Sequence, residues 1–155
     1  MLVNGTGVLV DASLNVNVRP SMFDRFFGRK PEPLTGAPQV RRIKSYSAAS
    51  GYAYQYCYLG RRAAQRREGR GTEYVFDVSG GREPYHPVSV FLLDASAASW
   101  EARKGRALIP AERYAIAKMS LLQAFDERSS PRLMTSGVLV RAADVDAIID
   151  VLGIE

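Results

Sequence analysis

The chain has 155 residues, of which 46% are hydrophobic and 24% are charged, a balance typical of one globular domain. The sequence has no apolar run of about 18–20 residues and no basic segment followed by an apolar core near its start, so we expect neither a transmembrane helix nor a signal peptide. The single cysteine, Cys57, cannot form an intrachain disulfide and fits a reducing compartment, which indicates a cytoplasmic protein.

The net charge of +5 is unevenly distributed along the chain. Residues 1–70 carry 12 Lys/Arg and 4 Asp/Glu, whereas residues 71–155 carry 9 Lys/Arg and 12 Asp/Glu. An excess of positive charge on one part of a protein favours an anionic partner, such as nucleic acid or the acidic face of another protein. The alternative is that the arginines are solvated surface residues without a partner.

The N-terminal part of the sequence predicts an extension to the main domain. Residues 13–19 alternate between apolar and polar side chains, which is typical of a strand. A short helix is expected over residues 22–27, followed by a proline-containing linker up to residue 38. We therefore divide the chain into an extension over 1–38 and a domain over 39–155. The short helix presents an apolar stripe that would suit a homo-oligomer contact: Met22, Phe23, Phe26 and Phe27.

The main domain opens with strand patterns. Strands are expected near 40–46 and over 51–60, 72–79 and 87–93, and their short connections predict an antiparallel meander of three to five strands. The stretch 61–71 is strongly basic and is expected to form a loop between two of these strands.

Helical periodicity follows the strands. A helix carrying Trp100 is expected to end at Gly105, and a second should run from Pro110 to about Glu127. Helical spacing predicts that the second helix buries Tyr114, Leu121 and Phe125 against the sheet. A last strand near 136–140 leads to a C-terminal helix. This helix should end at Gly153, with a Schellman motif. The predicted fold class is α+β, an antiparallel sheet packed against two or three helices.

The strongest candidate for a binding site is a tyrosine-rich strand followed by a cluster of arginines. Tyrosine rings can stack on bases, and guanidinium groups can bind phosphates, so this segment would suit nucleic acid. The alternative is that the tyrosines form the core face of the sheet, packed on the helix over 110–127. The candidate ligand-binding residues are Tyr52, Tyr54, Tyr56, Tyr58, Arg61, Arg62, Arg66, Arg67 and Arg70.

Residues for catalysis or metal binding are scarce. His86 is the only histidine, and its position between Pro84 and Pro87 predicts an exposed loop, although a small enzyme with a site around His86, Asp77 and the arginines is an alternative. Cys57 is expected to be an inert core thiol. One histidine and one cysteine cannot form a typical zinc site, so no metal or cofactor is expected. The sequence thus favours a non-enzymatic binding module, with a structural or assembly protein as the alternative.

Overall fold

A computed structural model describes residues 30–155, and its compact unit runs from Glu32 to Glu155. The strand predicted over 13–19 and the helix over 22–27, including Met22, Phe23, Phe26 and Phe27, lie outside the described residues.

The compact unit is built on one five-stranded sheet in the order β1-β2-β3-β4-β5. Neighbouring strands among the first four are antiparallel, as the meander prediction required. The last strand pairs parallel to β4, with Val90 opposite Val138, because helices separate the two strands along the chain. The strands are β1 (Lys44–Ser47), β2 (Ala53–Arg66), β3 (Gly69–Gly80), β4 (His86–Leu93) and β5 (Val138–Val140).

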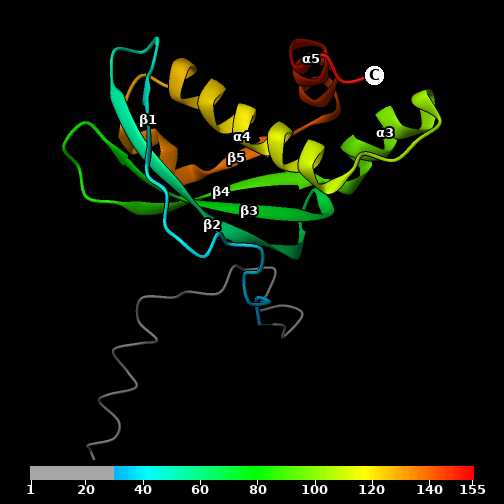
Figure 1. The fold of residues 1–155 in the computed structure, drawn as a ribbon, viewed down its shortest axis with the longest axis horizontal. Helices are drawn as coiled ribbons and strands as arrows, with labels where there is room; N and C mark the ends of the chain where they lie inside the picture. The colour runs from blue at the N-terminus through cyan, green and yellow to red at the C-terminus, as the bar shows by residue number, and fades with distance from the viewer. Residues whose placement is uncertain (1–29) are drawn as a thin grey trace, which may run out of the picture. The chain divides into compact units, whose positions relative to one another are not determined.

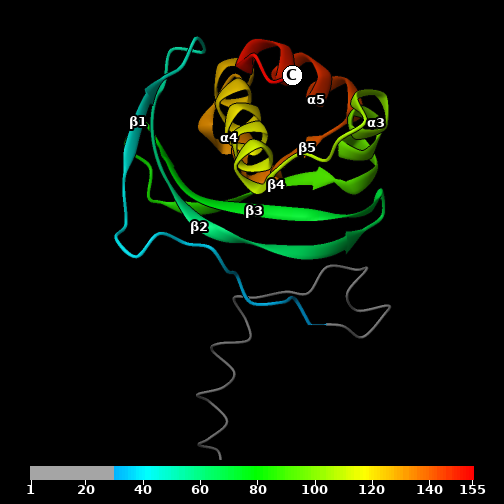
Figure 2. The same ribbon diagram turned by 45° about the vertical axis from the view of Figure 1, so that its right-hand side comes forward.

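The sheet is strongly curved, and the helices lie on its hollow side (Figures 1 and 2). They are α3 (Asp94–Lys104), α4 (Pro110–Glu127) and α5 (Ala142–Leu152), and a 3₁₀ turn over Pro131–Ser136 precedes β5. The predicted end of α3 and the predicted start of α4 are confirmed. Gly105 follows α3 with φ of 71°, and Pro110 is the first residue of α4. The predicted α+β fold class is therefore confirmed for residues 30–155.

The core lies between the concave face of the sheet and the helices. Side chains of alternate residues on β2, β3 and β4 point into it, since successive residues of a strand face opposite ways. From α4, Leu121 and Phe125 are fully buried, as predicted, whereas Tyr114 is only partly buried. The predicted apolar face of α4 is thus confirmed for the middle and the end of the helix.

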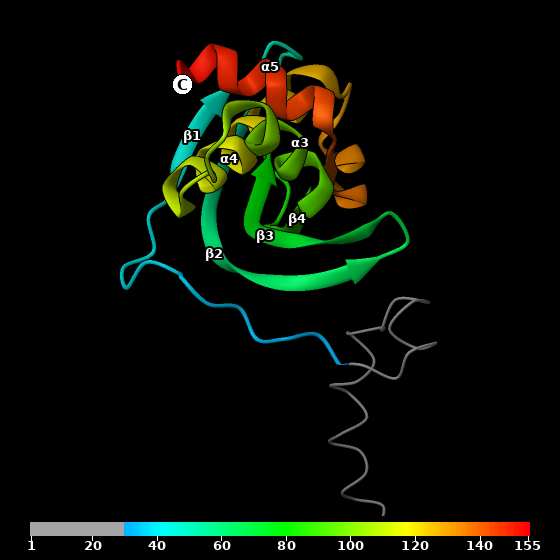
Figure 3. The ribbon, with the colours of Figure 1, turned by 90° about the vertical axis from the view of Figure 1, so that its right-hand side faces the viewer.

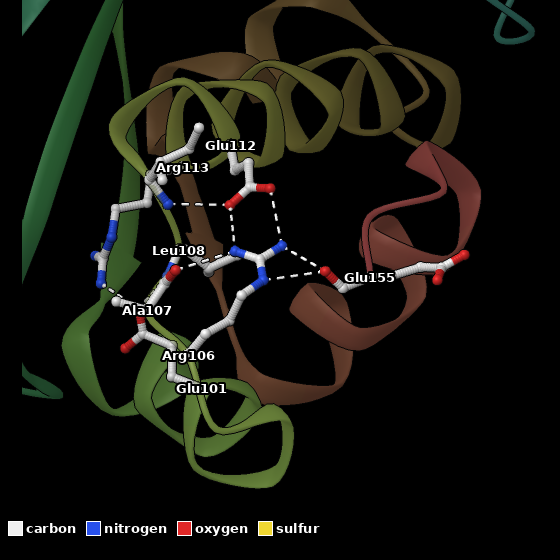
Figure 4. Close-up of polar contacts among 8 residues, drawn as sticks. Glu101, Arg106, Ala107, Leu108, Glu112, Arg113 and Glu155 are labelled. Atoms are coloured by element: carbon white, nitrogen blue, oxygen red, sulfur yellow. Dashed lines mark hydrogen bonds and ion pairs between the residues drawn. The ribbon is translucent and has the colours of Figure 1, made fainter.

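The helices are also joined by polar contacts around Arg106, in the connection between α3 and α4 (Figure 4). Its guanidinium donates one hydrogen bond to each carboxylate oxygen of Glu112, both at 3.0 Å. It also donates to the main-chain oxygen of Glu155, beyond α5. One side chain thereby links the start of α4 to the end of α5.

The C-terminal helix ends as predicted. The Ile154 N–H donates to the Ile149 oxygen at 3.2 Å and the Gly153 N–H to the Asp150 oxygen at 3.3 Å, which are the two bonds of a Schellman motif. Gly153 has φ of 69°, a conformation that glycine adopts without steric cost.

Two expectations about the strands were wrong. The stretch 61–71 is not a loop, because β2 continues to Arg66 and β3 begins at Gly69, leaving a two-residue turn (Figure 3). Its backbone groups are paired in the ladder between the two strands, which is more favourable than an extended loop. His86 is not in an exposed loop either: it is the first residue of β4, paired with Val78, and is half-buried.

Candidate functional site

The candidate site is the β2–β3 hairpin, and a bulge decides which of its side chains share a face. Tyr58 pairs with Phe76, but Gly60 pairs with Val75, so Leu59 is the extra residue on β2. Before the bulge, even-numbered residues of β2 face the helices; after it, odd-numbered residues do. As a result Arg61 lies on the concave face opposite Tyr74, whereas Arg62 and Arg66 lie on the convex face.

The tyrosines of β2 form part of the core. Tyr54 is 0% exposed and Tyr56 is 5% exposed, and both approach the ring of Phe125. Tyr58 contacts Tyr114 edge to face, with ring centroids 4.9 Å apart. Tyr52 alone of the four is exposed. The alternative that the tyrosines form the core face of the sheet is therefore correct for Tyr54 and Tyr56. Their rings cannot stack on a base without unfolding the sheet.

Two of the five arginines bind a carboxylate of the same hairpin. Arg62 Nε lies 2.7 Å from one oxygen of Glu73, and an Arg66 nitrogen lies 3.0 Å from the other. The Ser89 hydroxyl of β4 donates to Glu73 at 2.6 Å, and the Arg66 guanidinium lies 4.4 Å from the centre of the Phe91 ring. On the convex face, hydrogen bonds and ion pairs join four polar residues, which we name the Glu73 cluster: Arg62, Arg66, Glu73 and Ser89.

The Glu73 cluster controls the ionisation of its carboxylate. Burial on its own would raise the pKa of Glu73, but the hydrogen bonds from Arg62 and Ser89 and the charges of Arg62 and Arg66 outweigh it, and the pKa is lowered. Glu73 is therefore ionised at neutral pH and neutralises part of the positive charge of its two arginines. The structure thus gives Arg62 and Arg66 a role in the folded hairpin itself.

The other three arginines of the candidate site are exposed to solvent, including Arg61, although its position on β2 is on the concave face. Arg61, Arg67 and Arg70 are exposed, and none forms an ion pair with another residue of the part that the structure describes. The backbone of Arg61 is held by Thr35, with N–O distances of 2.9 and 2.8 Å in the two directions. The hairpin therefore presents guanidinium groups from a hydrogen-bonded framework, an arrangement suited to phosphate or carboxylate groups.

The residues considered for catalysis are not brought together. His86 pairs with Val78 and shares the concave face, whereas Asp77 lies on the convex face, where Arg41 binds it at 2.6 Å. The His86 Nε2 atom is buried, with no hydrogen-bond partner among residues 30–155. Cys57 is 2% exposed, and burial raises the pKa of its thiol, as expected for an inert core cysteine.

The sequence analysis missed a pocket at the outer edge of β2. The pocket has a volume of about 490 Å³ and brings Arg42 and Lys44 together with Tyr56, Tyr58 and Tyr114. The one local signal is that Arg42 and Lys44 share a face in the strand predicted over 40–46. The tyrosines that complete the pocket come from positions that sequence spacing cannot connect.

No family model, curated protein or solved structure matches the chain. Among the helices of residues 30–155, none is long and apolar enough to cross a membrane.

Proposed function

We propose that the protein is a non-enzymatic binding module whose β2–β3 hairpin recognises an anionic partner. The observation that carries this proposal is the division of the arginines: Arg62 and Arg66 bind Glu73, whereas Arg61, Arg67 and Arg70 are exposed without an acidic partner in the described region. Exposed positive charges without acidic partners attract anionic groups, and a bound polyanion would neutralise them.

The burial of the tyrosines narrows the kind of partner. Base stacking needs exposed aromatic faces, and Tyr54 and Tyr56 offer none. Guanidinium groups that contact the phosphates of nucleic acid position a protein on it without reading its bases. The hairpin is therefore proposed to bind a nucleic-acid backbone by charge, with little preference for sequence.

The test is fluorescence anisotropy with short single- and double-stranded oligonucleotides at two salt concentrations. The variant Arg67→Ala/Arg70→Ala removes two exposed guanidinium groups, and Arg82→Ala/Arg132→Ala is a matched control that removes two exposed arginines elsewhere. Each phosphate contact that is lost should reduce the slope of log affinity against log salt by about 0.7–0.9. The hairpin variant should therefore bind more weakly and with a flatter slope, and the control should not.

Two results would count against nucleic acid. The first is no binding at low salt, and the second is binding that the hairpin variant leaves unchanged. A parallel titration uses labelled polyglutamate. If polyglutamate binds, the oligonucleotides do not, and the hairpin variant binds polyglutamate more weakly, the partner is an acidic protein surface.

A further inference from the structure

The pocket beside β2 arises because the chain leaves the sheet edge and returns to it. Lys44 pairs with Tyr56 at the start of β1, and Thr35 pairs with Arg61 in an isolated bridge. Between these two points, residues 36–43 loop outwards past residues 57–60 of β2. The mismatch of eight residues against four opens the pocket of about 490 Å³, a volume in the range of small-molecule sites.

The charge of the pocket is positive. Among the residues that the structure describes, Arg42 and Lys44 line it and no carboxylate does. The acids on neighbouring elements are already bound: Asp77 by Arg41 at 2.6 Å, and Asp126 by the Tyr46 hydroxyl at 2.8 Å. Neither Arg42 nor Lys44 forms an ion pair with any residue in 30–155.

A third cation lies close to the pocket. Lys118 is one helical turn beyond Tyr114 on α4, and it is half-buried. Burial, followed by repulsion from the ammonium of Lys44, lowers the pKa of Lys118. A bound anion near Lys44 would offset that repulsion.

Part of the pocket wall is aromatic, and the rest includes Pro38, Gln39, Val40 and Cys57. Tyr56, Tyr58 and Tyr114 line it from the sheet and from α4, and the last two rings meet edge to face. Burial raises the pKa of all three hydroxyls, so they stay neutral and can donate hydrogen bonds. The Tyr58 hydroxyl is buried and has no hydrogen-bond partner among the described residues. Aromatic walls with a few polar groups are typical of sites for flat organic ligands.

From this geometry we propose that the pocket binds a small aromatic anion, a flat ring that carries a phosphate or a carboxylate group. The ring lies against Tyr58 and Tyr114, which are only partly buried, and the anionic group lies between Arg42 and Lys44. The proposal concerns residues other than the arginines of the hairpin and does not depend on the hairpin binding a polyanion.

The test is isothermal titration calorimetry of the full chain with four probes: phenyl phosphate, benzoate, phenol and inorganic phosphate. The variant Arg42→Ala/Lys44→Ala removes both cations, and Lys104→Ala/Arg132→Ala is a control with exposed residues of the same types. Loss of a charge-assisted hydrogen bond to the anionic group should weaken the affinity at least about tenfold. We expect at least one aromatic anion to bind and the pocket variant to weaken it at least about tenfold, with the control unchanged.

The probes distinguish the parts of the proposal. Binding of phenyl phosphate but not of benzoate would identify phosphate as the anionic group. Binding of benzoate but not of phenyl phosphate would identify a carboxylate. No binding of either aromatic anion would overturn the proposal, and so would phenol binding as tightly as they do. Inorganic phosphate binding as tightly as phenyl phosphate would overturn the role of the tyrosines.

A second variant protects the test against misfolding. Lys44→Met keeps the aliphatic stem of the side chain and removes only the charge. Circular dichroism would verify that each variant is folded. Binding of the aromatic anion to folded Lys44→Met with unchanged affinity would overturn the placement of the anionic group.

Discussion

The ring of Tyr54 on β2 lies flat against the ring of Phe125 on α4, with centroids 3.9 Å apart and 7° between the planes. Both side chains are 0% exposed. The hydroxyl of Tyr54 is buried as well and has no hydrogen-bond partner in residues 30–155. This pair therefore joins the sheet to α4 through ring contact and not through a hydrogen bond.

The first prediction follows from this pair. Tyr54→Phe keeps the stacked ring and removes a buried hydroxyl without a partner, so the free energy of unfolding should stay the same or rise by about 1 kcal/mol. Phe125→Ala removes the ring itself and should lower it by about 3–5 kcal/mol. Urea unfolding at neutral pH measures both. A loss above about 1 kcal/mol for Tyr54→Phe would mean that the hydroxyl has a partner.

The second prediction concerns pH and the Glu73 cluster. The pKa of Glu73 is lowered in the folded protein relative to its ordinary value of 4.5. Its ionised form therefore stabilises the fold at pH values above that ordinary value, and this contribution is lost as the pH falls through the lowered pKa. Glu73→Gln should be less stable than the parent at pH 7, and the difference should shrink as the pH approaches 3.

The measurement is urea unfolding of both proteins at several pH values from 7 to 3. Glu112, whose pKa is lowered by Arg106 and by the Ile109 N–H, remains in Glu73→Gln, so some acid destabilisation should persist in the variant. A stability difference that does not change with pH would contradict the assignment to the Glu73 carboxylate.

The third prediction concerns the contacts of Arg106 shown in Figure 4. Its guanidinium binds both oxygens of Glu112 in the figure. It also lies 5.1 Å from the centre of the Trp100 ring. Lysine cannot form two parallel hydrogen bonds to a carboxylate, so Arg106→Lys should lower the midpoint of thermal unfolding. Arg103→Lys is the matched control, because Arg103 binds Asp146 through a single nitrogen and is more exposed. An equal effect of the two substitutions would contradict the role of the paired geometry.

Local sequence signals predicted the helices well. Pro110 marks the first residue of α4, and Gly105 and Gly153 mark the ends of α3 and α5, because each of these residues has a backbone preference that acts within one helical turn. The burial of Leu121 and Phe125 followed from helical periodicity in the same way.

The candidate site was harder to predict because it depends on contacts between distant residues. The bulge at Leu59 reverses which side chains of β2 face the core. Its local signal is Gly60, with φ of 128°, but a glycine at this position fits the end of a strand as well as a bulge. Without the bulge, alternation would place Arg62 on the concave face, away from Glu73. The pocket needs the return of residues 36–43 to the sheet edge, which the predicted linker gave no reason to expect.

The last prediction separates the arginines of the hairpin by their effect on stability. Arg62 binds Glu73, whose side chain is 12% exposed, so Arg62→Ala leaves a largely buried carboxylate with fewer partners. That change should lower the free energy of unfolding by about 1–3 kcal/mol. Arg67 and Arg70 are exposed and make no ion pair within residues 30–155, and Arg67→Ala/Arg70→Ala should change it by no more than about 0.5 kcal/mol.

Urea unfolding of the two variants and the parent at pH 7 measures this difference. Adding Glu73→Ala to Arg62→Ala provides a double-mutant cycle, in which the two losses should be less than additive because the residues contact each other. Additive losses would contradict the contact between Arg62 and Glu73. If Arg67→Ala/Arg70→Ala is as destabilising as Arg62→Ala, the arginines do not divide into a structural and a binding group. The hairpin would then owe its stability to its arginines as a set, and the exposed ones would not be available to a partner without cost to the fold.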